Sequence, residues 1–396
     1  MNKTIKLAVA GAVLSAASVA NAGIIIPAGE WTMDINGNVN VYASVNNTDN
    51  ADAVTGGLAG VNEATSGEDT EFSIGTGLLP AWMGFTGTTR QNDLDVSFTI
   101  SFQPNTSNNG VAGDNAGDAN GSGPLNRQAF ITFGDASWGS IKLGKDLGIF
   151  ASDAILNDMT LLGVGSGTDR SGASTTLGGI GTGYLYAAWK GQVAYTTPNM
   201  NGFQATVGIT NPNQLTNLSG GLNAKQDRFG LEGKASYSFT NGKIWVSAAS
   251  YKANVSATVE HDVTVADIGV NFNVGNLGLT GYIYSGEGAG TTFLGQNGAT
   301  AAGLERDSDG GYIQATYTIP TGTKLGVAAG VSRVDLANGE AASALIDENK
   351  RWTVGAYHPL TKHLNLVAEY NSIESDSHNG LSAESDSMSL GAILFF

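Results

Sequence analysis

The chain of 396 residues contains 56 glycines and no cysteine, and its formal net charge is −16 at pH 7. An acidic excess of this size disfavours nucleic acid as a partner, and the lack of cysteine excludes a disulfide framework. Charged residues make up only 14% of the chain, which argues against ordinary disorder. The abundant glycine fits the turns, bulges and bends of a β structure.

The first segment of the chain has the pattern of a secretory signal peptide. Lys3 and Lys6 give it a positive start, a short run of apolar and small residues follows, and Ala20-Asn21-Ala22 is an A-x-A cleavage site. We expect residues 1–22 to be removed and residues 23–396 to form one β-barrel domain. Without the two lysines, the formal charge of that domain is −18. No later run of eighteen apolar residues exists, so no transmembrane helix is expected.

Beyond the signal peptide, strand-like segments alternate with connections, and short connections alternate with long ones. The short ones carry turn chemistry, such as Asn241-Gly242 and Pro320-Thr321-Gly322. Transmembrane barrels show this alternation because turns lie on one side of the membrane and loops on the other. Sixteen strands are predicted, at 31–44, 71–87, 92–104, 125–134, 138–145, 186–197, 202–210, 227–238, 243–253, 259–273, 276–286, 310–319, 323–335, 349–358, 363–373 and 386–396.

Alternation within these segments shows which side chains share a face of the sheet. Asn365 and Glu369 fall on one face of their strand. The final strand carries apolar residues on one face, namely Met388, Leu390, Ala392, Leu394 and Phe396. A soluble protein seldom leaves such an edge unpaired, although the terminal strand of a soluble sandwich is the alternative. The sequence predicts an all-β fold, a 16-stranded antiparallel transmembrane β-barrel whose last strand pairs with its first.

A connection of about forty residues, 146–185, follows a hairpin at 126–145, and a compact domain seldom contains so long a loop. Here the sequence resembles the trimeric general porins of Gram-negative outer membranes. The residues that carry the resemblance are the hairpin motif from Arg127 to Lys145, Asp153-Ala154, Asp158-Met159, Gln192-Val193-Ala194-Tyr195-Thr196-Thr197-Pro198 with Gly202-Phe203, and Met83-Gly84-Phe85-Thr86-Gly87.

In that family the third loop folds into the barrel and narrows it, so the resemblance implies an inserted third loop at this position. Asp153 and Asp158 match the acidic residues of the loop. Arg127 and Lys145 match basic residues of the wall, and Lys190 matches a third with a slip of one or two residues. Acids facing bases across a narrow wet passage create a transverse field, which favours small polar solutes that can align with it.

Two residues depart from the family pattern. Trp82 stands where the family usually has another wall arginine, and Leu162 stands near the place of a second loop acid. Other roles also remain open for the matched residues. Arg127 fits a base at the membrane interface, and the two loop aspartates fit turn or helix-cap positions.

These features predict a passive diffusion porin in the outer membrane of a Gram-negative bacterium. It would conduct ions and small hydrophilic solutes, with a mild preference for cations because of its acidic charge. The resemblance implies a homotrimer that contacts outer-membrane lipid and lipopolysaccharide. It also implies that the terminal Phe396 is part of the signal read by the barrel-assembly machinery.

Two other functions are compatible with a barrel of this kind. One is a substrate-selective outer-membrane channel, and the other is a closed barrel with an adhesive or enzymatic role. The four histidines are scattered without metal-ligand spacing, and no Ser, His and acid stand at a defined spacing. We therefore expect no catalytic residues, no metal site and no cofactor.

Overall fold

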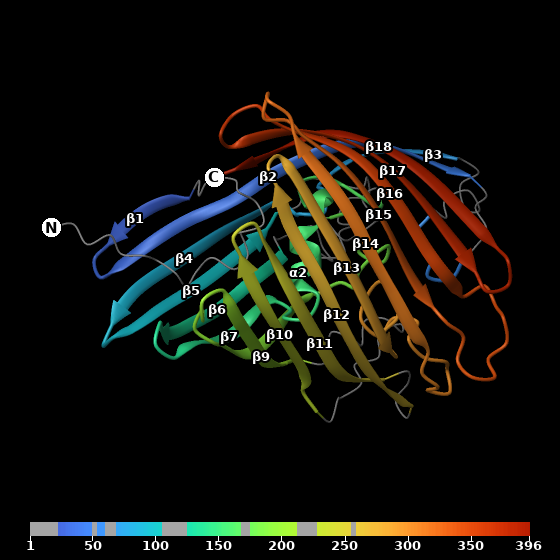
Figure 1. Ribbon diagram of the computed structural model, residues 1–396, viewed down its shortest axis with the longest axis horizontal. Coiled ribbons are helices and arrows are strands. Elements are labelled where there is room, and N and C mark those ends of the chain that lie inside the picture. Colours follow the sequence, from blue (N-terminus) through green and yellow to red (C-terminus); the bar gives the residue numbers. More distant parts are fainter. Residues whose placement is uncertain are drawn as a thin grey trace.

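The computed structural model describes residues 23–49, 54–59, 69–104, 125–167, 175–211, 228–254 and 259–396, so the predicted signal peptide lies outside it. The strands form one antiparallel sheet that closes on itself, as Figure 1 shows. The elements are β1 (Ile24–Ala28), β2 (Trp31–Asp49), β3 (Thr70–Gly75), β4 (Trp82–Gln91), β5 (Leu94–Gln103), β6 (Leu125–Asp135), β7 (Gly139–Leu147), α2 (Ser152–Asn157), η1 (Met159–Leu162), β8 (Trp189–Thr196), β9 (Phe203–Thr210), β10 (Gly230–Phe239), β11 (Gly242–Asn254), β12 (Glu260–Val274), β13 (Leu277–Glu287), β14 (Asp307–Thr318), β15 (Lys324–Val334), β16 (Ile346–Pro359), β17 (Leu364–Ser377) and β18 (Ser382–Phe395).

Strand β2 closes the barrel, because it pairs with two strand segments along each of its edges. On one edge, β1 pairs with residues 31–35 and β18 with residues 38–49. On the other edge, β4 pairs with residues 32–38 and β3 with residues 42–47. The eighteen segments of the sheet therefore occupy sixteen strand positions. This confirms the predicted 16-stranded antiparallel barrel and the pairing of its last strand with its first.

One predicted strand, residues 71–87, is broken into β3 and β4. Side chains of β2 bond the irregular stretch between them: Asn38 Nδ2 donates to Pro80 O at 3.1 Å, and Asn40 Oδ1 accepts from Gly77 N at 2.9 Å. Pro80 has no N–H and cannot continue a ladder. Side-chain amides therefore satisfy the backbone where the ladder is interrupted.

Two other differences concern the ends of elements. The sequence does not predict β1, and the connection predicted at 374–385 is confined to residues 378–381, because β17 and β18 pair beyond the predicted strand ends. Elsewhere connection length differs between the two ends of the barrel. The short-turn end carries turns such as 240–241 and 275–276, and the long-loop end carries loops such as 288–306.

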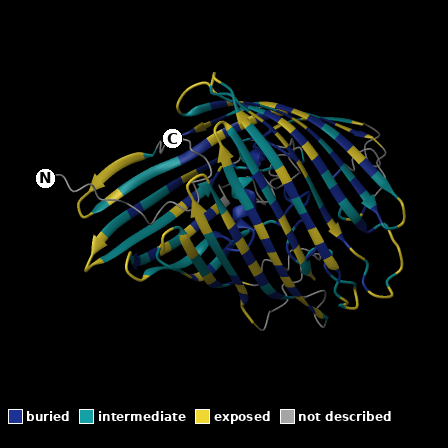
Figure 2. Ribbon diagram, in the orientation of Figure 1, coloured by how far each residue is buried: buried dark blue, intermediate teal, exposed yellow. Residues whose placement is uncertain are grey.

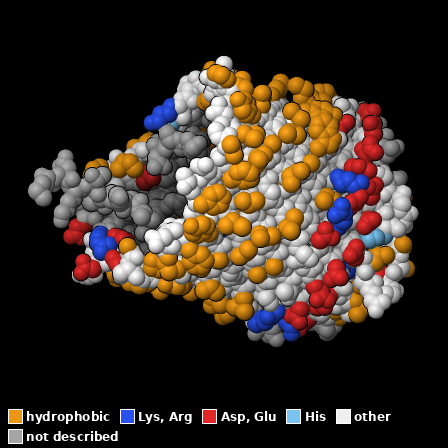
Figure 3. All heavy atoms as spheres, in the orientation of Figure 1, with side chains coloured by type: hydrophobic (Ala, Val, Ile, Leu, Met, Phe, Trp, Pro, Cys, Tyr) orange, Lys and Arg blue, Asp and Glu red, His pale blue; other side chains and the backbone are white. Residues whose placement is uncertain are grey.

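Side chains along the strands alternate between the lumen and the outer face, which appears as alternating colours in Figure 2. On β18, Met388 and Leu390 are 55% and 51% exposed, whereas Ser387 and Ser389 are buried. The apolar side chains of the last strand therefore face outward. Figure 3 shows hydrophobic side chains gathered in a broad band across the outer wall, with a line of charged side chains along its border at the long-loop end.

Tryptophans of membrane barrels often gather at the two borders of the apolar band, and those of this chain do so only in part. Trp138 and Trp352 are exposed on the outer face, at 36% and 46%. Trp82 and Trp245 are buried on the lumenal side of the wall instead. A tryptophan near a strand end is therefore not sufficient to place that residue at the membrane interface.

The main apolar cluster lies inside the barrel, between the wall and the connection from β7 to β8. Phe150, Ile155 and Tyr184 of this connection pack against wall residues that include Trp245 and Tyr312. Both helices in the described part of the chain, α2 and η1, belong to this connection. No helix in the described part of the chain is long and apolar enough to cross a membrane.

We predict that removal of Phe396 lowers the yield of folded barrel. Phe396 and Gly37 exchange two backbone hydrogen bonds, of 2.8 and 3.1 Å, at the end of the closing ladder. Each bond contributes about 0.5–1.5 kcal/mol, so the deletion weakens closure of the sheet. The folded fraction after refolding in detergent is measured by heat-modifiable electrophoretic mobility. The variant Phe396→Ala is the control that removes only the ring, and an unchanged yield after the deletion would contradict this role of the residue.

Candidate functional site

The connection from β7 to β8 folds back into the barrel, where Figure 1 places α2. Its described residues, 148–167 and 175–188, follow the inner wall, and hydrogen bonds to side chains of β14, β15 and β2 hold them there. These bonds run from Tyr312 OH to Ala154 O (2.8 Å), from Gly183 N to Ser332 Oγ (3.0 Å) and from Tyr42 OH to Leu162 O (2.6 Å). The predicted inserted third loop is confirmed.

A carboxylate of the wall holds the beginning of the inserted loop. Glu232 on β10 accepts hydrogen bonds at one oxygen, Oε2, from Ile149 N at 2.6 Å and from Phe150 N at 3.0 Å. Its other oxygen, Oε1, lies 2.6 Å from Lys190 Nζ. Buried amide groups need partners, and a carboxylate can accept from two consecutive ones. Glu232 thus satisfies backbone that leaves the ladder at the end of β7.

A second wall carboxylate holds the loop on the opposite side of the lumen. Glu369 Oε2 on β17 accepts hydrogen bonds from Val164 N and Gly165 N, both at 2.8 Å. Tyr357 OH donates to Glu369 Oε1 at 2.6 Å. The inserted loop is therefore held at two separated points by paired amide contacts of the same kind.

Asp153, on α2, meets two bases of the wall. Its carboxylate oxygens lie 3.1 Å from Lys234 Nζ on β10 and 2.5 Å from Lys243 Nζ on β11. Burial alone would raise the pKa of Asp153, but the two ammonium groups outweigh it and hold the pKa below its ordinary value. An acid of the loop thus faces bases of the wall, although neither lysine is among those that the sequence singles out.

Asp158 lies between the helices and bonds mainly within the loop. Its oxygens accept from Thr160 N at 2.9 Å, Gly179 N at 2.9 Å and Tyr184 OH at 2.7 Å. Asp158 therefore caps η1 and ties the two halves of the loop together. One wall base, Arg351 on β16, approaches its carboxylate at 3.9 Å.

Arg127 enters the lumen because of an irregularity in the sheet. Asn126 and Gln128 pair with consecutive residues of β5, so Arg127 is an extra residue between them, as in a β-bulge. Its guanidinium carbon lies 4.4 Å from the ring centre of Trp189 and 5.2 Å from that of Trp82. The side chain is almost fully buried between the two indoles.

The two lysines predicted for the wall are placed differently. Lys190 faces inward, where its ammonium group pairs with Glu232. Lys145 shares the face of Leu143, whose cross-strand partner Ile131 is 47% exposed, so Lys145 lies on the outer face. Its Nζ donates to Asn126 O at 2.8 Å. The structure therefore brings Arg127 and Lys190 to the lumen but not Lys145.

Five charged residues that the sequence does not predict for the site contact the loop or its acids. They are Glu232, Lys234, Lys243, Arg351 and Glu369. Alternation along the strand places each of them on one face, as it does for Glu369 with Asn365. Alternation does not show which wall residues the inserted loop will touch.

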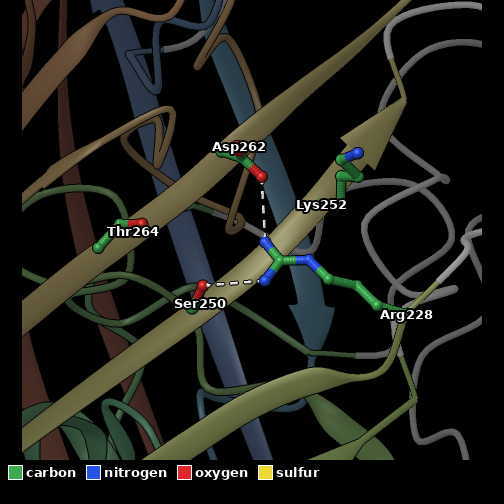
Figure 4. A pocket seen from close by; sticks show the side chains of 5 residues that line it. All are labelled: Arg228, Ser250, Lys252, Asp262 and Thr264. Atoms are coloured by element: carbon green, nitrogen blue, oxygen red, sulfur yellow. Dashed lines mark hydrogen bonds and ion pairs between the residues drawn. The ribbon is translucent and has the colours of Figure 1, made fainter.

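A pocket outside the lumen is lined by Arg228, Ser250, Lys252, Asp262 and Thr264 (Figure 4). Arg228 reaches across β11, with its nitrogens 3.0 Å from Asp262 Oδ1 and 3.5 Å from Ser250 Oγ. These side chains lie on the outer wall and are not part of the passage. Among the described residues, no group of three or more His, Cys, Asp or Glu could hold a metal ion.

Comparison with known proteins agrees with this architecture. The sequence model of the family described as Gram-negative porin matches residues 7–378. The chain belongs to this family. As a Gram-negative porin it is a barrel of the outer membrane and forms a passive channel. No curated protein sequence matches it.

Solved porin structures share the fold over most of the chain. The anion-selective porin from Comamonas acidovorans matches with a TM-score of 0.65 and 14% identity, over 93% of this chain and 100% of that one. The Salmonella typhi OmpF complex with daunomycin matches with a TM-score of 0.62 and 16% identity, over 94% and 100%. The trimer form of OmpT from Vibrio cholerae matches with a TM-score of 0.57 and 14% identity, over 92% and 99%. At such identities the likeness shows the fold.

We predict that Glu369→Gln loosens the inserted loop while the barrel stays folded. The amide keeps one acceptor oxygen but loses the charge that strengthens the bonds to Val164 and Gly165. Loss of a charged hydrogen bond costs about 1.5–3 kcal/mol. Hydrogen exchange of the peptide covering residues 159–165, followed by mass spectrometry, should become faster.

The matched control for this prediction is Glu374→Gln. Glu374 is on the same strand but pairs with Lys350 on the outer face. Exchange of the loop peptide should be unchanged in this control. Equal protection in the wild type and in Glu369→Gln would show that Glu369 does not hold the loop.

Proposed function

We propose that this porin is a passive diffusion channel for ions and small hydrophilic solutes, and that its inserted loop sets the width of the passage. The observation that carries the proposal is the attachment of the loop inside the lumen, through Glu232 and Glu369. A 16-stranded barrel is wide enough for an aqueous channel, and a loop fixed against its wall narrows it. Membership of the porin family supports a channel without enzymatic activity.

The charged constriction is part of this proposal. We assign Asp153 and Asp158 to its acidic side, and Arg127 and Lys190 to its basic side. The contacts of Asp153 with Lys234 and Lys243 support adding these two lysines to the basic side. The outer position of Lys145 removes it from the set.

A homotrimer is proposed because the Vibrio cholerae OmpT structure of similar fold is described as a trimer form. The apolar band in Figure 3 suits contact with lipid or with neighbouring copies of the chain. We also propose removal of residues 1–22 as a signal peptide, contact of the barrel with outer-membrane lipid and lipopolysaccharide, and recognition of Phe396 by the barrel-assembly machinery.

We propose a weak preference for cations that originates at the long-loop end. Many acids lie there, among them Asp307, Asp335, Asp347 and Glu384. Inside the lumen the charges are largely paired, as in Lys142 with Asp146 and Lys190 with Glu232. Fixed charge at a channel mouth concentrates counter-ions, which here are cations.

The first test of this function removes residues 155–180 and replaces them with a short Gly-Ser linker. If the loop sets the width, single-channel conductance in a planar bilayer should rise, and liposomes should swell in larger sugars. A control removes the exposed residues 341–343 from the connection between β15 and β16, and it should leave conductance nearly unchanged. An unchanged conductance after the first deletion, in a folded protein, would refute the proposed role of the loop.

The second test measures reversal potentials in a gradient of potassium chloride. We expect a weak preference for potassium that fades as salt rises, because the Debye length shrinks to about 3 Å at 1 M. The double variant Asp335→Asn/Asp347→Asn should reduce the preference, whereas Glu374→Gln on the outer wall should change it less. A preference for chloride at low salt in the wild type would refute the proposed ion preference.

A further inference from the structure

A second connection of the long-loop end, residues 288–306 between β13 and β14, also enters the barrel. Its first half is turned inward, since Ala289, Thr292 and Leu294 are buried, whereas Leu304 near its other end is 53% exposed. Ala289 and Leu294 belong to the main apolar cluster, which also contains residues of the inserted loop. Two connections therefore share the interior of the barrel, although the sequence predicts only one inserted loop.

Backbone and side-chain contacts join this connection to the inserted loop. Tyr186 N donates to Thr292 O at 3.0 Å, in a parallel bridge that pairs Tyr186 with Phe293. The rings of these two residues meet edge to face, with centroids 5.9 Å apart and planes at 80°, a favourable arrangement for aromatic pairs. At Gly181, where φ is +77°, a Cβ atom would lie only 2.5 Å from Thr292 Oγ1, so glycine permits the close approach.

The connection has anchors of its own, away from the inserted loop. Arg306 Nη1 donates to Asn297 O at 2.8 Å, and Arg306 Nε donates to Glu340 Oε2, in the connection between β15 and β16, at 2.8 Å. Gly290 N donates to Ser308 Oγ on β14 at 3.0 Å. Hydrogen bonds between arginine and a carboxylate are among the stronger ones in proteins. Residues 288–306 are therefore fixed to the wall and to a neighbouring connection, and they can hold the inserted loop in turn.

We propose that residues 288–306 are a second restricting element of the channel, which narrows the passage at the long-loop end and positions the returning part of the inserted loop, residues 175–188. The inference rests on the proposed function, in which the inserted loop sets the width of the passage. The two wall carboxylates hold residues 149–150 and 164–165, both before this returning part. The bridge at Phe293 supplies a contact after it, so the two connections together determine the space left for solutes.

The first test replaces residues 289–305 with a short Gly-Ser turn. The ladder between β13 and β14 ends at the pair Glu287–Asp307, so the replacement leaves the wall intact. Single-channel conductance should rise and liposome swelling should extend to larger sugars, because a segment inside the lumen is removed. An unchanged conductance in a folded barrel would overturn the proposal, and the channel function would still stand if removal of residues 155–180 raised conductance. A wild-type barrel that conducts no ions would instead refute the channel function.

The second test is Phe293→Ala, which removes the ring that meets Tyr186. Phe293 acts through Tyr186 and is a positioning residue, so hydrogen exchange of a peptide covering residues 184–188 should become faster by about threefold or more. The sugar limit in liposome swelling should shift upward while heat-modifiable mobility stays that of a folded barrel. The matched control is Leu304→Ala, at the exposed end of the same connection, which should change neither quantity. Equal exchange in the wild type and Phe293→Ala, or an equal acceleration in Leu304→Ala, would overturn the proposal.

The third test uses the absence of cysteine from the chain. Neighbouring strands lie about 4.7–4.9 Å apart, within the Cα separation of about 4.4–6.8 Å that a disulfide spans, so Tyr186→Cys/Phe293→Cys should cross-link on mild oxidation. The oxidised barrel should conduct as the wild type does, and the reduced barrel should admit larger sugars. If the variant with residues 289–305 replaced does not assemble, this pair decides the question. A pair that does not cross-link, or equal sugar limits in its two redox states, would overturn the proposal.

Discussion

The structure depends on one constraint, that backbone N–H and C=O groups away from water must find partners within the chain. Around the wall, the closed ladder between β18 and β2 meets this requirement. In the lumen, the described residues of the inserted loop form isolated bridges and single backbone bonds, such as Leu78 N to Gly163 O, in place of a continuous ladder. Side chains of the wall provide further partners. Glu232 and Glu369 each accept hydrogen bonds from two consecutive amide groups of the loop. Closure of the wall and placement of the loop are therefore two consequences of the same requirement.

The strand order and most strand positions could be predicted because their signals are local. Alternation over a few residues and Asn-Gly or Pro-led turns identify a hairpin without knowledge of its neighbours. The strand prediction was wrong where a contact with a distant part of the chain determines the backbone conformation. The break between β3 and β4 depends on Asn38 and Asn40, which are about forty positions earlier in the chain. No pattern within residues 71–87 indicates those two partners.

The candidate site was predictable to a smaller degree. Motif resemblance located the inserted loop and its two aspartates, but it could not supply their contacts. Asp153 meets Lys234 and Lys243 because α2 lies against β10 and β11, which depends on the path of the loop through space. The inward turn of Arg127 depends on a register shift against β5, and the outward position of Lys145 depends on the regular register of β7. Both are properties of strand pairing and not of composition.

Along one edge of β2, β18 and β1 are successive pairing partners with a single gap between them. Phe396 exchanges hydrogen bonds with Gly37, and Ile24 lies opposite Ile35, so only the position opposite Asn36 separates the end of β18 from the start of β1. The two segments follow one another along the same edge as if they were one strand. A covalent link across this gap, with new chain ends placed in a turn such as residues 275–276, would preserve every strand pairing. The fold therefore depends on the order of the strands around the barrel, and the position of the two chain ends in that order is secondary.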